Sequence, residues 1–292
     1  MRVLVTGWPS FLHGEATAGD VLSMRTVAAA LDTAGVAFDT AWSPAFRPGA
    51  LHLDDAEPAA YSHVVFACGP AHGEQLRWLH DRYASCRRIA VGVSVIDPAD
   101  RAVTGFHRVL ARDGDAVARA DLALAASTTR VPVAGFVLAP GQHEYGERRR
   151  HEQVHEALLD WAGGLDCARV PLDTRLDSAD WRHCATGDAF VSLVERLDVV
   201  VTTRLHGLVL ALHAGVPALA VDPVAGGGKV SAQAHALDWP ALVPAEQADA
   251  GRLGHWWNWC LSTRAGDAAA APRRRVRPLD GALTALLDEV SR

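Results

Sequence analysis

The sequence has few cysteines and lacks the spacings that hold metals or form disulfide frameworks. Its 292 residues include five cysteines, an odd number, and none belongs to a Cys-x-x-Cys pair. We therefore expect neither a disulfide framework nor a zinc site, and no other cluster predicts a metal. Reduced thiols are the default in the cytoplasm, which is where we expect the protein. The cysteines are Cys68, Cys86, Cys167, Cys184 and Cys260.

The chain also lacks an excess of positive charge and a long apolar run. Its formal net charge is -6, which argues against non-specific nucleic-acid binding. No apolar run is long enough to span a bilayer. Because Met1 and Arg2 lead directly into a predicted strand, we expect no signal peptide.

The signatures of common nucleotide cofactors are missing as well. Residues 17–20 resemble a phosphate-binding turn, but they lack the glycine spacing and the lysine of a P-loop and the fingerprint of a dinucleotide site. ATP and NAD are therefore poorly supported, and we expect no cofactor. By itself, Asp20 is better explained as the N-cap of a helix.

What the sequence does contain is an alternation of buried strands and amphipathic helices, which predicts βαβ units with parallel strands. A polar, proline-containing stretch at residues 127–132 is the best candidate for a linker. We predict an α/β protein with domains at residues 1–127 and 128–277 and a terminal helix in residues 278–292. Predicted strands cover residues 3–6, 36–40, 63–67, 89–94, 121–125, 133–139, 168–171, 199–201 and 218–221. Predicted helices cover residues 20–31, 73–83, 106–118, 148–161, 188–197, 205–214, 230–236 and 279–290, and residues 268–275 are predicted as a loop.

The most informative stretch is residues 198–222, which predicts a strand, a tight turn, a helix and a second strand. Val199–Val201 are β-branched and uncharged, as in a strand buried on both faces. The apolar residues then change to helical spacing until Gly215 ends the helix. The turn places Arg204 and His206 at the carboxyl end of a strand, where open α/β sheets bind ligands.

Arg204 and His206 bring complementary chemistry to this turn. A helix N-terminus favours an anion, and a guanidinium can hold a carboxylate or phosphate through two parallel hydrogen bonds. His206 can move a proton near neutral pH. A surface cap for Arg204 and an ordinary helix position for His206 remain the alternative, although the strand-to-helix context favours function. A second anion-friendly turn is Gly226–Gly228 before Lys229, although three glycines equally often form a flexible loop.

The segment from Leu197 to Val243 resembles the polysaccharide pyruvyl transferase family. The resemblance implies a GT-B-like pair of Rossmann-like domains with parallel sheets facing across a cleft, with the acceptor on the first domain and the donor on the second. It also implies transfer of pyruvate from phosphoenolpyruvate, the co-substrate, onto two hydroxyls of a sugar or glycan as a ketal. The matching residues are Asp198–Gly207, Ala214–Pro217, Gly228 and Lys229, and in the first half Gly14–Asp20, Gly69 and Ala111–Asp113.

The resemblance and the chemistry of the donor together assign roles. Phosphoenolpyruvate carries a carboxylate and a phosphate, so several cations should converge on it. We assign the clamp to Arg204 and Arg112, and a phosphate contact to Lys229. His206 is the expected acid and base, which makes His206 and Arg204 the predicted catalytic residues. The remaining predicted substrate-binding residues are Gly19, Asp20 and Thr203.

Two other functions stay open at this point. In a GT-B-type nucleotide-sugar glycosyltransferase, Arg204 and Lys229 would hold a diphosphate. A non-catalytic sugar-phosphate-binding protein would keep the cleft without the proton transfers. The expected partners are a small-molecule donor and a saccharide acceptor; the acceptor sugar and the oligomeric state, a homo-oligomer included, are left undecided by the sequence.

Overall fold

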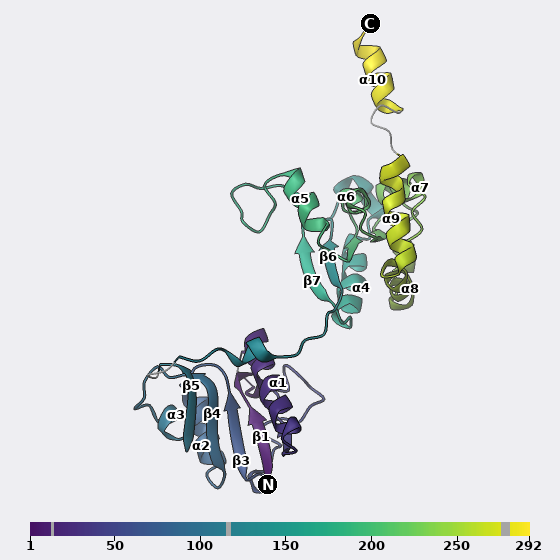
Figure 1. Cartoon of the computed structure of the whole chain (residues 1–292). Helices are drawn as coiled ribbons and strands as arrows, with labels where there is room; N and C mark the ends of the chain where they lie inside the picture. The colour runs from purple at the N-terminus through teal and green to yellow at the C-terminus, as the bar shows by residue number, and fades with distance from the viewer. Residues whose placement is uncertain (13–14, 115–117, 276–280) are drawn as a thin grey trace. The chain divides into compact units, whose positions relative to one another are not determined.

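The computed structural model describes residues 1–12, 15–114, 118–275 and 281–292. The chain divides into two compact units, Met1–Thr129 and Arg130–Arg292, each built on a five-stranded parallel sheet (Figure 1). The division falls two residues after the predicted boundary at 127/128, in a stretch without regular secondary structure. The predicted boundary at 277/278 lies outside the described residues, as do His13 and Gly14.

The first unit has the strand order β2-β1-β3-β4-β5, and every neighbouring pair is parallel. Alternate residues of β1 face opposite sides of the sheet, as the pleat requires. Val3 and Val5 pack with Met24 of α1, whereas Leu4 belongs to the core that contains Leu76 of α2. The elements are β1 (Arg2–Thr6), α1 (Ala18–Thr33), β2 (Ala37–Thr40), β3 (His63–Ala67), α2 (Glu74–Arg82), β4 (Arg87–Ser94), α3 (Arg101–Thr104) and β5 (Arg108–Asp113).

The second unit has the order β10-β9-β8-β6-β7, which is the same arrangement when its strands are counted from β6. Its central strand β8 pairs in parallel with β6 and β9 and is buried along its whole length, as predicted. The strands are β6 (Val133–Val137), β7 (Ala168–Leu172), β8 (Val199–Thr202), β9 (Ala218–Asp222) and β10 (Leu242–Pro244). The helices are α4 (His151–Gly163), α5 (Gly187–Val194), α6 (Leu205–Ala214), α7 (Lys229–Ala236), α8 (Ala250–Cys260), α9 (Thr263–Arg275) and α10 (Ala282–Val290).

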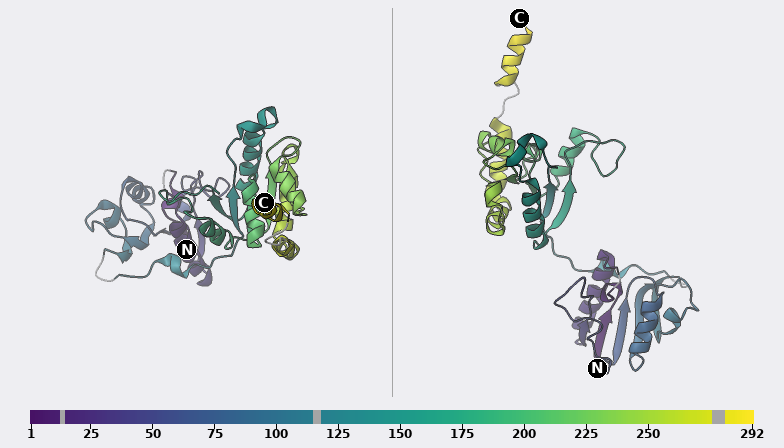
Figure 2. Two further views of the ribbon diagram at one scale, coloured as in Figure 1. Left: turned by 90° about the horizontal axis from the view of Figure 1, so that it is seen from above. Right: turned by 180° about the vertical axis from the view of Figure 1, so that it is seen from behind.

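Three predicted elements are wrong. Residues 106–118 were expected to be helical but contain the edge strand β5, because its backbone pairs with β4. Residues 121–125 form a 3₁₀ turn capped by the side chain of Asp121, not a strand. Residues 268–275 belong to α9, because alanine has the highest helix propensity and Ala265 and Ala269 are buried. Helix α9, which lies in the yellow-green part of Figure 2, packs against α6.

Each unit has a topological switch point between its first and third strands. In the first unit, α1 after β1 and α2 after β3 cover opposite faces of the sheet. A crevice therefore opens between the carboxyl ends of β1 and β3, and the equivalent place in the second unit lies between β6 and β8. The fold thus predicts one ligand site at each of these two places. None of the described helices has the length and hydropathy needed to cross a membrane.

Candidate functional site

The turn between β8 and α6 places Arg204 and His206 at the carboxyl edge of the second sheet. Arg204 is the N-cap residue of α6, and its backbone is extended. The Thr202 hydroxyl accepts a hydrogen bond from the Arg204 N–H at 2.9 Å and donates one to the Val137 carbonyl at 2.9 Å. Gly207 is needed because a Cβ there would lie 2.1 Å from the Thr202 hydroxyl oxygen. The sequence therefore fixes this turn by close packing.

The Arg204 guanidinium is anchored from one side. Its Nη1 forms an ion pair with Asp173 and donates to the Thr174 hydroxyl at 2.8 Å; both partners follow β7. Burial opposes ionisation of Asp173, but hydrogen bonds from Arg175 and the charge of Arg204 hold its pKa below the usual value. Within the part of the chain that the structure describes, Nη1 is the only anchored atom of the guanidinium, so Nε and Nη2 remain for a ligand.

His206 lies on the first turn of α6 and is exposed. Helix α6 begins without a side-chain cap, so no described side chain satisfies its first N–H groups. Such a helix end binds an anion through its N–H groups and its dipole. The turn therefore brings together open N–H groups, a guanidinium edge and an imidazole.

Thr203, predicted to bind substrate, is buried and makes internal contacts. Its hydroxyl accepts from the Ala139 N–H at 2.8 Å and lies 3.2 Å from Nε2 of His155 on α4. These contacts connect the loop after β6 to the turn after β8, directly across the switch point. Next to His155, His151 is buried, and burial lowers the pKa of both imidazoles.

Lys229 is the first residue of α7, but an internal carboxylate already occupies this helix end. Asp222, fully buried at the end of β9, accepts from the N–H groups of Gly228 at 2.7 Å and Ser231 at 2.8 Å. The anion site predicted from the glycines of this turn is therefore occupied by the protein's own Asp222 carboxylate. Any ligand contact here falls to the Lys229 side chain, which is partly exposed.

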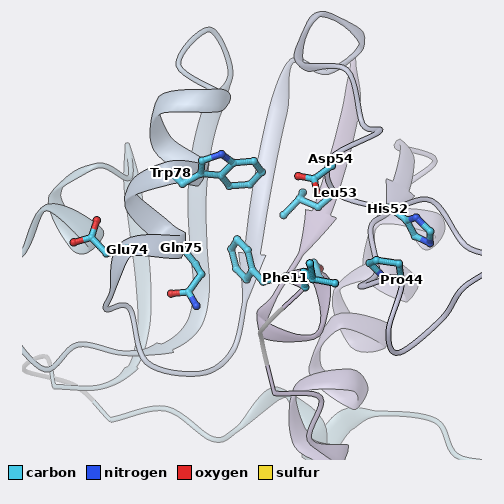
Figure 3. A pocket seen from close by; sticks show the side chains of 10 residues that line it. Phe11, Pro44, His52, Leu53, Asp54, Glu74, Gln75 and Trp78 are labelled. Carbon is cyan, nitrogen blue, oxygen red and sulfur yellow. The ribbon is translucent and has the colours of Figure 1, made fainter.

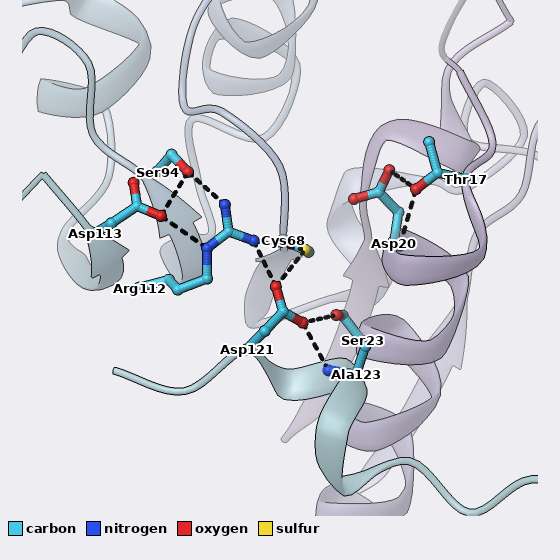
Figure 4. Close-up of polar contacts among 9 residues, drawn as sticks. All are labelled: Thr17, Asp20, Ser23, Cys68, Ser94, Arg112, Asp113, Asp121 and Ala123. Atoms are coloured by element: carbon cyan, nitrogen blue, oxygen red, sulfur yellow. Dashed lines mark hydrogen bonds and ion pairs between the residues drawn. The ribbon is translucent and has the colours of Figure 1, made fainter. Parts of the chain in front are cut away.

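The first unit has a cavity of about 550 Å³ at its own switch point, which we call the polar cavity after the carboxylates and the guanidinium among its lining residues. Trp8 and Cys68, which follow β1 and β3, lie on its wall as the topology predicts. The three predicted residues of this unit, Gly19, Asp20 and Arg112, all line the cavity. The structure therefore brings together residues that are almost a hundred positions apart in the sequence. Figure 4 shows Asp20 on one side and Arg112 on the other.

Arg112 is held by carboxylates rather than left free (Figure 4). Its Nε donates to Asp113 at 2.8 Å, its Nη1 to Asp121 at 2.5 Å and its Nη2 to the Ser94 hydroxyl at 2.6 Å. The Arg112 hydrogen bond lowers the pKa of Asp113. The Ala123 N–H and Arg112 lower the pKa of Asp121 against the effect of burial. With two ionised carboxylates beside one guanidinium, the local net charge is negative. Arg112 is therefore poorly placed to clamp an anionic donor.

Asp20 adds a further carboxylate to the same cavity. Helix α1 begins at Ala18, two residues before the predicted start, because Thr17 is the N-cap and accepts from the Asp20 N–H at 3.2 Å. The Thr17 hydroxyl donates to the Asp20 carboxylate at 2.7 Å. The Thr17 side chain thus satisfies one of the first N–H groups of α1, and the Asp20 carboxylate adds negative charge at this helix end. The N-cap role considered for Asp20 therefore belongs to Thr17.

Three carboxylates that shape these sites were missed by sequence reasoning. Asp222 and Asp173 end or directly follow a strand, and an acidic residue at that position of a parallel sheet was a usable signal. Asp121 gave no such signal, because it reaches Arg112 only through the tertiary fold. No group of three or more His, Cys, Asp or Glu residues in the described ranges is placed to hold a metal ion.

One segment of the chain matches a known protein family. Residues 185–223 match the family model of polysaccharide pyruvyl transferase. A search of curated proteins gave no match. Structures similar to this chain include a spinosyn rhamnosyltransferase complexed with spinosyn aglycone, at 14% identity and a TM-score of 0.39 over 100% of both chains. The glycosyltransferase of kitacinnamycin has 15% identity and a TM-score of 0.37 over 99% of this chain and 98% of that chain.

An E. coli heptosyltransferase with ADP is similar at 14% identity, with a TM-score of 0.29 over 93% of this chain and 100% of that chain. Identities at this level concern the fold alone. The predicted α/β architecture with two parallel sheets is confirmed by the strand order of the two units. The resemblance to polysaccharide pyruvyl transferases is confirmed over residues 185–223, the segment that contains Arg204 and His206.

Proposed function

We propose that the protein is a pyruvyl transferase that moves pyruvate from phosphoenolpyruvate onto a sugar or glycan acceptor as a ketal. The observation that carries this proposal is the uncapped N-terminus of α6, beside Arg204 and His206, inside the segment that matches the family model. Phosphoenolpyruvate is anionic at both its carboxylate and its phosphate. The turn offers N–H groups, a guanidinium edge and an acid/base group to such a molecule. No cofactor enters the proposal.

The second unit would bind the donor and carry the chemistry. The α6 N–H groups and the free edge of Arg204 would hold one anionic group, and Lys229 would reach the other. His206 would protonate the methylene carbon of the enol, and an acceptor hydroxyl would attack the adjacent carbon and lose its proton. The first hydroxyl proton would return to His206. Breaking of the bond between the carbon and the phosphate oxygen, and attack by the second hydroxyl, whose proton leaves with the phosphate, would complete the ketal. The products are the ketal and inorganic phosphate.

The first unit would bind the acceptor in its polar cavity. The carboxylates of Asp20 and Asp121 can accept hydrogen bonds from sugar hydroxyls, and the excess of carboxylates around Arg112 disfavours an anion there. In this proposal Arg112 no longer clamps the donor. It pairs with Asp113 and orients Asp121 within the acceptor cavity.

A nucleotide-sugar glycosyltransferase is the second candidate. The same uncapped helix end, with Arg204 at the start of α6 and Lys229 at the start of α7, also fits a diphosphate. The segment that matches the pyruvyl transferase model gives preference to phosphoenolpyruvate as the donor.

A thermal-shift panel of phosphoenolpyruvate, UDP-sugars and GDP-sugars tests the choice of donor. A ligand at a hundred times its dissociation constant stabilises the folded state by about 2.7 kcal/mol. We expect stabilisation by phosphoenolpyruvate and none by the nucleotide sugars. The reverse result would replace the proposal with the glycosyltransferase. Binding of phosphoenolpyruvate without phosphate release across a panel of acceptors would favour a non-catalytic binding protein.

A further inference from the structure

The first unit has a second cavity, of about 340 Å³, that the proposed reaction does not use (Figure 3). Phe11 and Leu53 are buried in its wall, and Pro44 adds a further apolar surface. Leu12 and Trp78 also line it but are 53% and 39% exposed. A concave apolar surface bordered by exposed apolar side chains is typical of a ligand site.

The charged groups around this cavity are paired or hydrated. The Glu74 carboxylate accepts a hydrogen bond from Arg77 at 2.7 Å. Asp54 is exposed, and Arg82 donates to its backbone carbonyl at 2.6 Å while lying 5.6 Å from the ring centre of Trp78. Positive charge therefore accompanies negative charge at the rim. A neutral apolar group suits the apolar wall better than an amine or an anion, because Glu74 is already paired with Arg77 and the Asp54 side chain is exposed to solvent.

An aromatic pair lies between the apolar cavity and the polar cavity. Trp8 lines the polar cavity and Phe11 the apolar one, and their ring centres are 5.7 Å apart. Gly69 permits this arrangement, since it has a φ of 73° and a Cβ there would lie 2.1 Å from the Trp8 ring. The Trp8 Nε1 is buried and has no hydrogen-bond partner among the described residues. Trp8 thus carries a buried donor without an acceptor, beside Gly69 in the wall of the polar cavity.

We propose that the acceptor is an amphiphile, in which the saccharide of the polar cavity carries a neutral alkyl or aryl group that enters the apolar cavity. The inference rests on the proposed function, because that function assigns the saccharide to the polar cavity. One ligand can contact both cavities because a single aromatic pair separates them. The Trp8 N–H can donate to an oxygen at the link between sugar and apolar group. Each buried methylene is worth about fourfold in affinity.

Titration calorimetry with two glycosides tests this inference without any requirement for turnover. Octyl glucoside, kept below its micelle concentration, should bind at least tenfold tighter than methyl glucoside. Trp78→Ala should remove most of this advantage and leave methyl glucoside binding unchanged. Trp181→Ala is the matched control, because Trp181 is 91% exposed and lies in the other unit. If Trp78→Ala folds poorly, Leu12→Ser at the exposed mouth should show the same selective loss.

Equal affinity for the two glycosides, or an octyl advantage that survives both substitutions, would overturn the inference. The outcome is separable from that of the proposed function. Stabilisation by phosphoenolpyruvate together with equal glycoside binding would overturn the amphiphilic acceptor alone. Selective octyl binding without any response to phosphoenolpyruvate would overturn the donor assignment instead.

Discussion

The two units share one strand order but differ in charge at their switch points. In the first unit, α1 is capped by Thr17 and carries Asp20 in its first turn, and Arg112 is paired with Asp113 and Asp121. In the second, α6 starts without a side-chain cap beside Arg204. Topology therefore fixes where a ligand can bind, whereas the residues after each strand determine which ligand charge the site favours.

Two helices of the second unit also differ in whether a side chain caps their N-terminus. Helices α6 and α7 each follow a buried strand of one sheet, yet only α7 receives an internal carboxylate, from Asp222. Glycine-rich sequence and a following lysine are typical of an anion site, but they do not reveal such a carboxylate. Whether a helix N-terminus is open to an anion therefore depends on tertiary contacts and does not follow from the local sequence.

The largest expected effect comes from removing the proton donor of the second unit. His206→Ala should lower turnover by about a hundredfold or more, the usual scale for a lost general acid, with little change in phosphoenolpyruvate affinity. His206→Gln should be nearly as inactive, since a hydrogen bond without titration does not supply the proton. Steady-state phosphate release with an identified acceptor measures both variants.

The control for this substitution is on the same helix. His213 is exposed in the last turn of α6, so His213→Ala should leave turnover unchanged. Normal turnover by His206→Ala would assign His206 to an ordinary helix position and leave the second-unit site without its proposed acid/base group.

The next largest effect is expected from removing the carboxylate that caps the N-terminus of α7. Asp222→Ala leaves the N–H groups of Gly228 and Ser231 without their acceptor in a partly buried setting, which should cost about 1–3 kcal/mol of unfolding free energy. Urea unfolding measures the loss. Added phosphate should restore part of it if the exposed helix end then binds an anion. Unchanged stability would show that the carboxylate does not cap α7.

A smaller effect is expected when the Arg204 guanidinium is replaced by an ammonium group of the same charge. Arg204→Lys should weaken phosphoenolpyruvate binding about tenfold, because a planar fork becomes a point charge and the anchoring by Asp173 and Thr174 is lost. Calorimetry gives the affinity, and the exposed Arg182→Lys is the control. Equal affinity of the Arg204 variant and the unchanged protein would exclude Arg204 as the clamp.

The sequence predicts the local parts of this structure well. The strand–helix–strand from Val199 to Asp222 is correct within a residue at each end, since a β-branched run, helical spacing and Gly215 act locally. The segment of β5 is misread because its spacing fits a helix as well as an edge strand. The position of Arg204 follows from such local signals. The acidity around Arg112 does not, because Asp121 meets it only after folding.

The smallest predicted effect concerns a histidine pair behind the second-unit switch point. His151 is 1% exposed, and neither ring nitrogen has a hydrogen-bond partner among the described residues. Burial lowers the pKa of His151, with the charge of Arg149 acting in the same direction and Glu152 against it. Burial also lowers the pKa of His155, and the neighbouring His151 adds to the effect. Folding therefore favours the neutral imidazoles.

Linkage gives the sign of the resulting pH dependence. Below the ordinary histidine pKa of about 6.5, the unfolded chain binds protons that these two folded imidazoles do not. Their contribution to the unfolding free energy is present above that pH and is lost as pH falls toward their lowered pKa values. Urea unfolding between pH 7 and pH 5 should show a shallower decline for His151→Phe than for the unchanged protein. The exposed His213→Gln should keep the original slope, and an unaltered slope in His151→Phe would show that this imidazole does not resist protonation in the folded state.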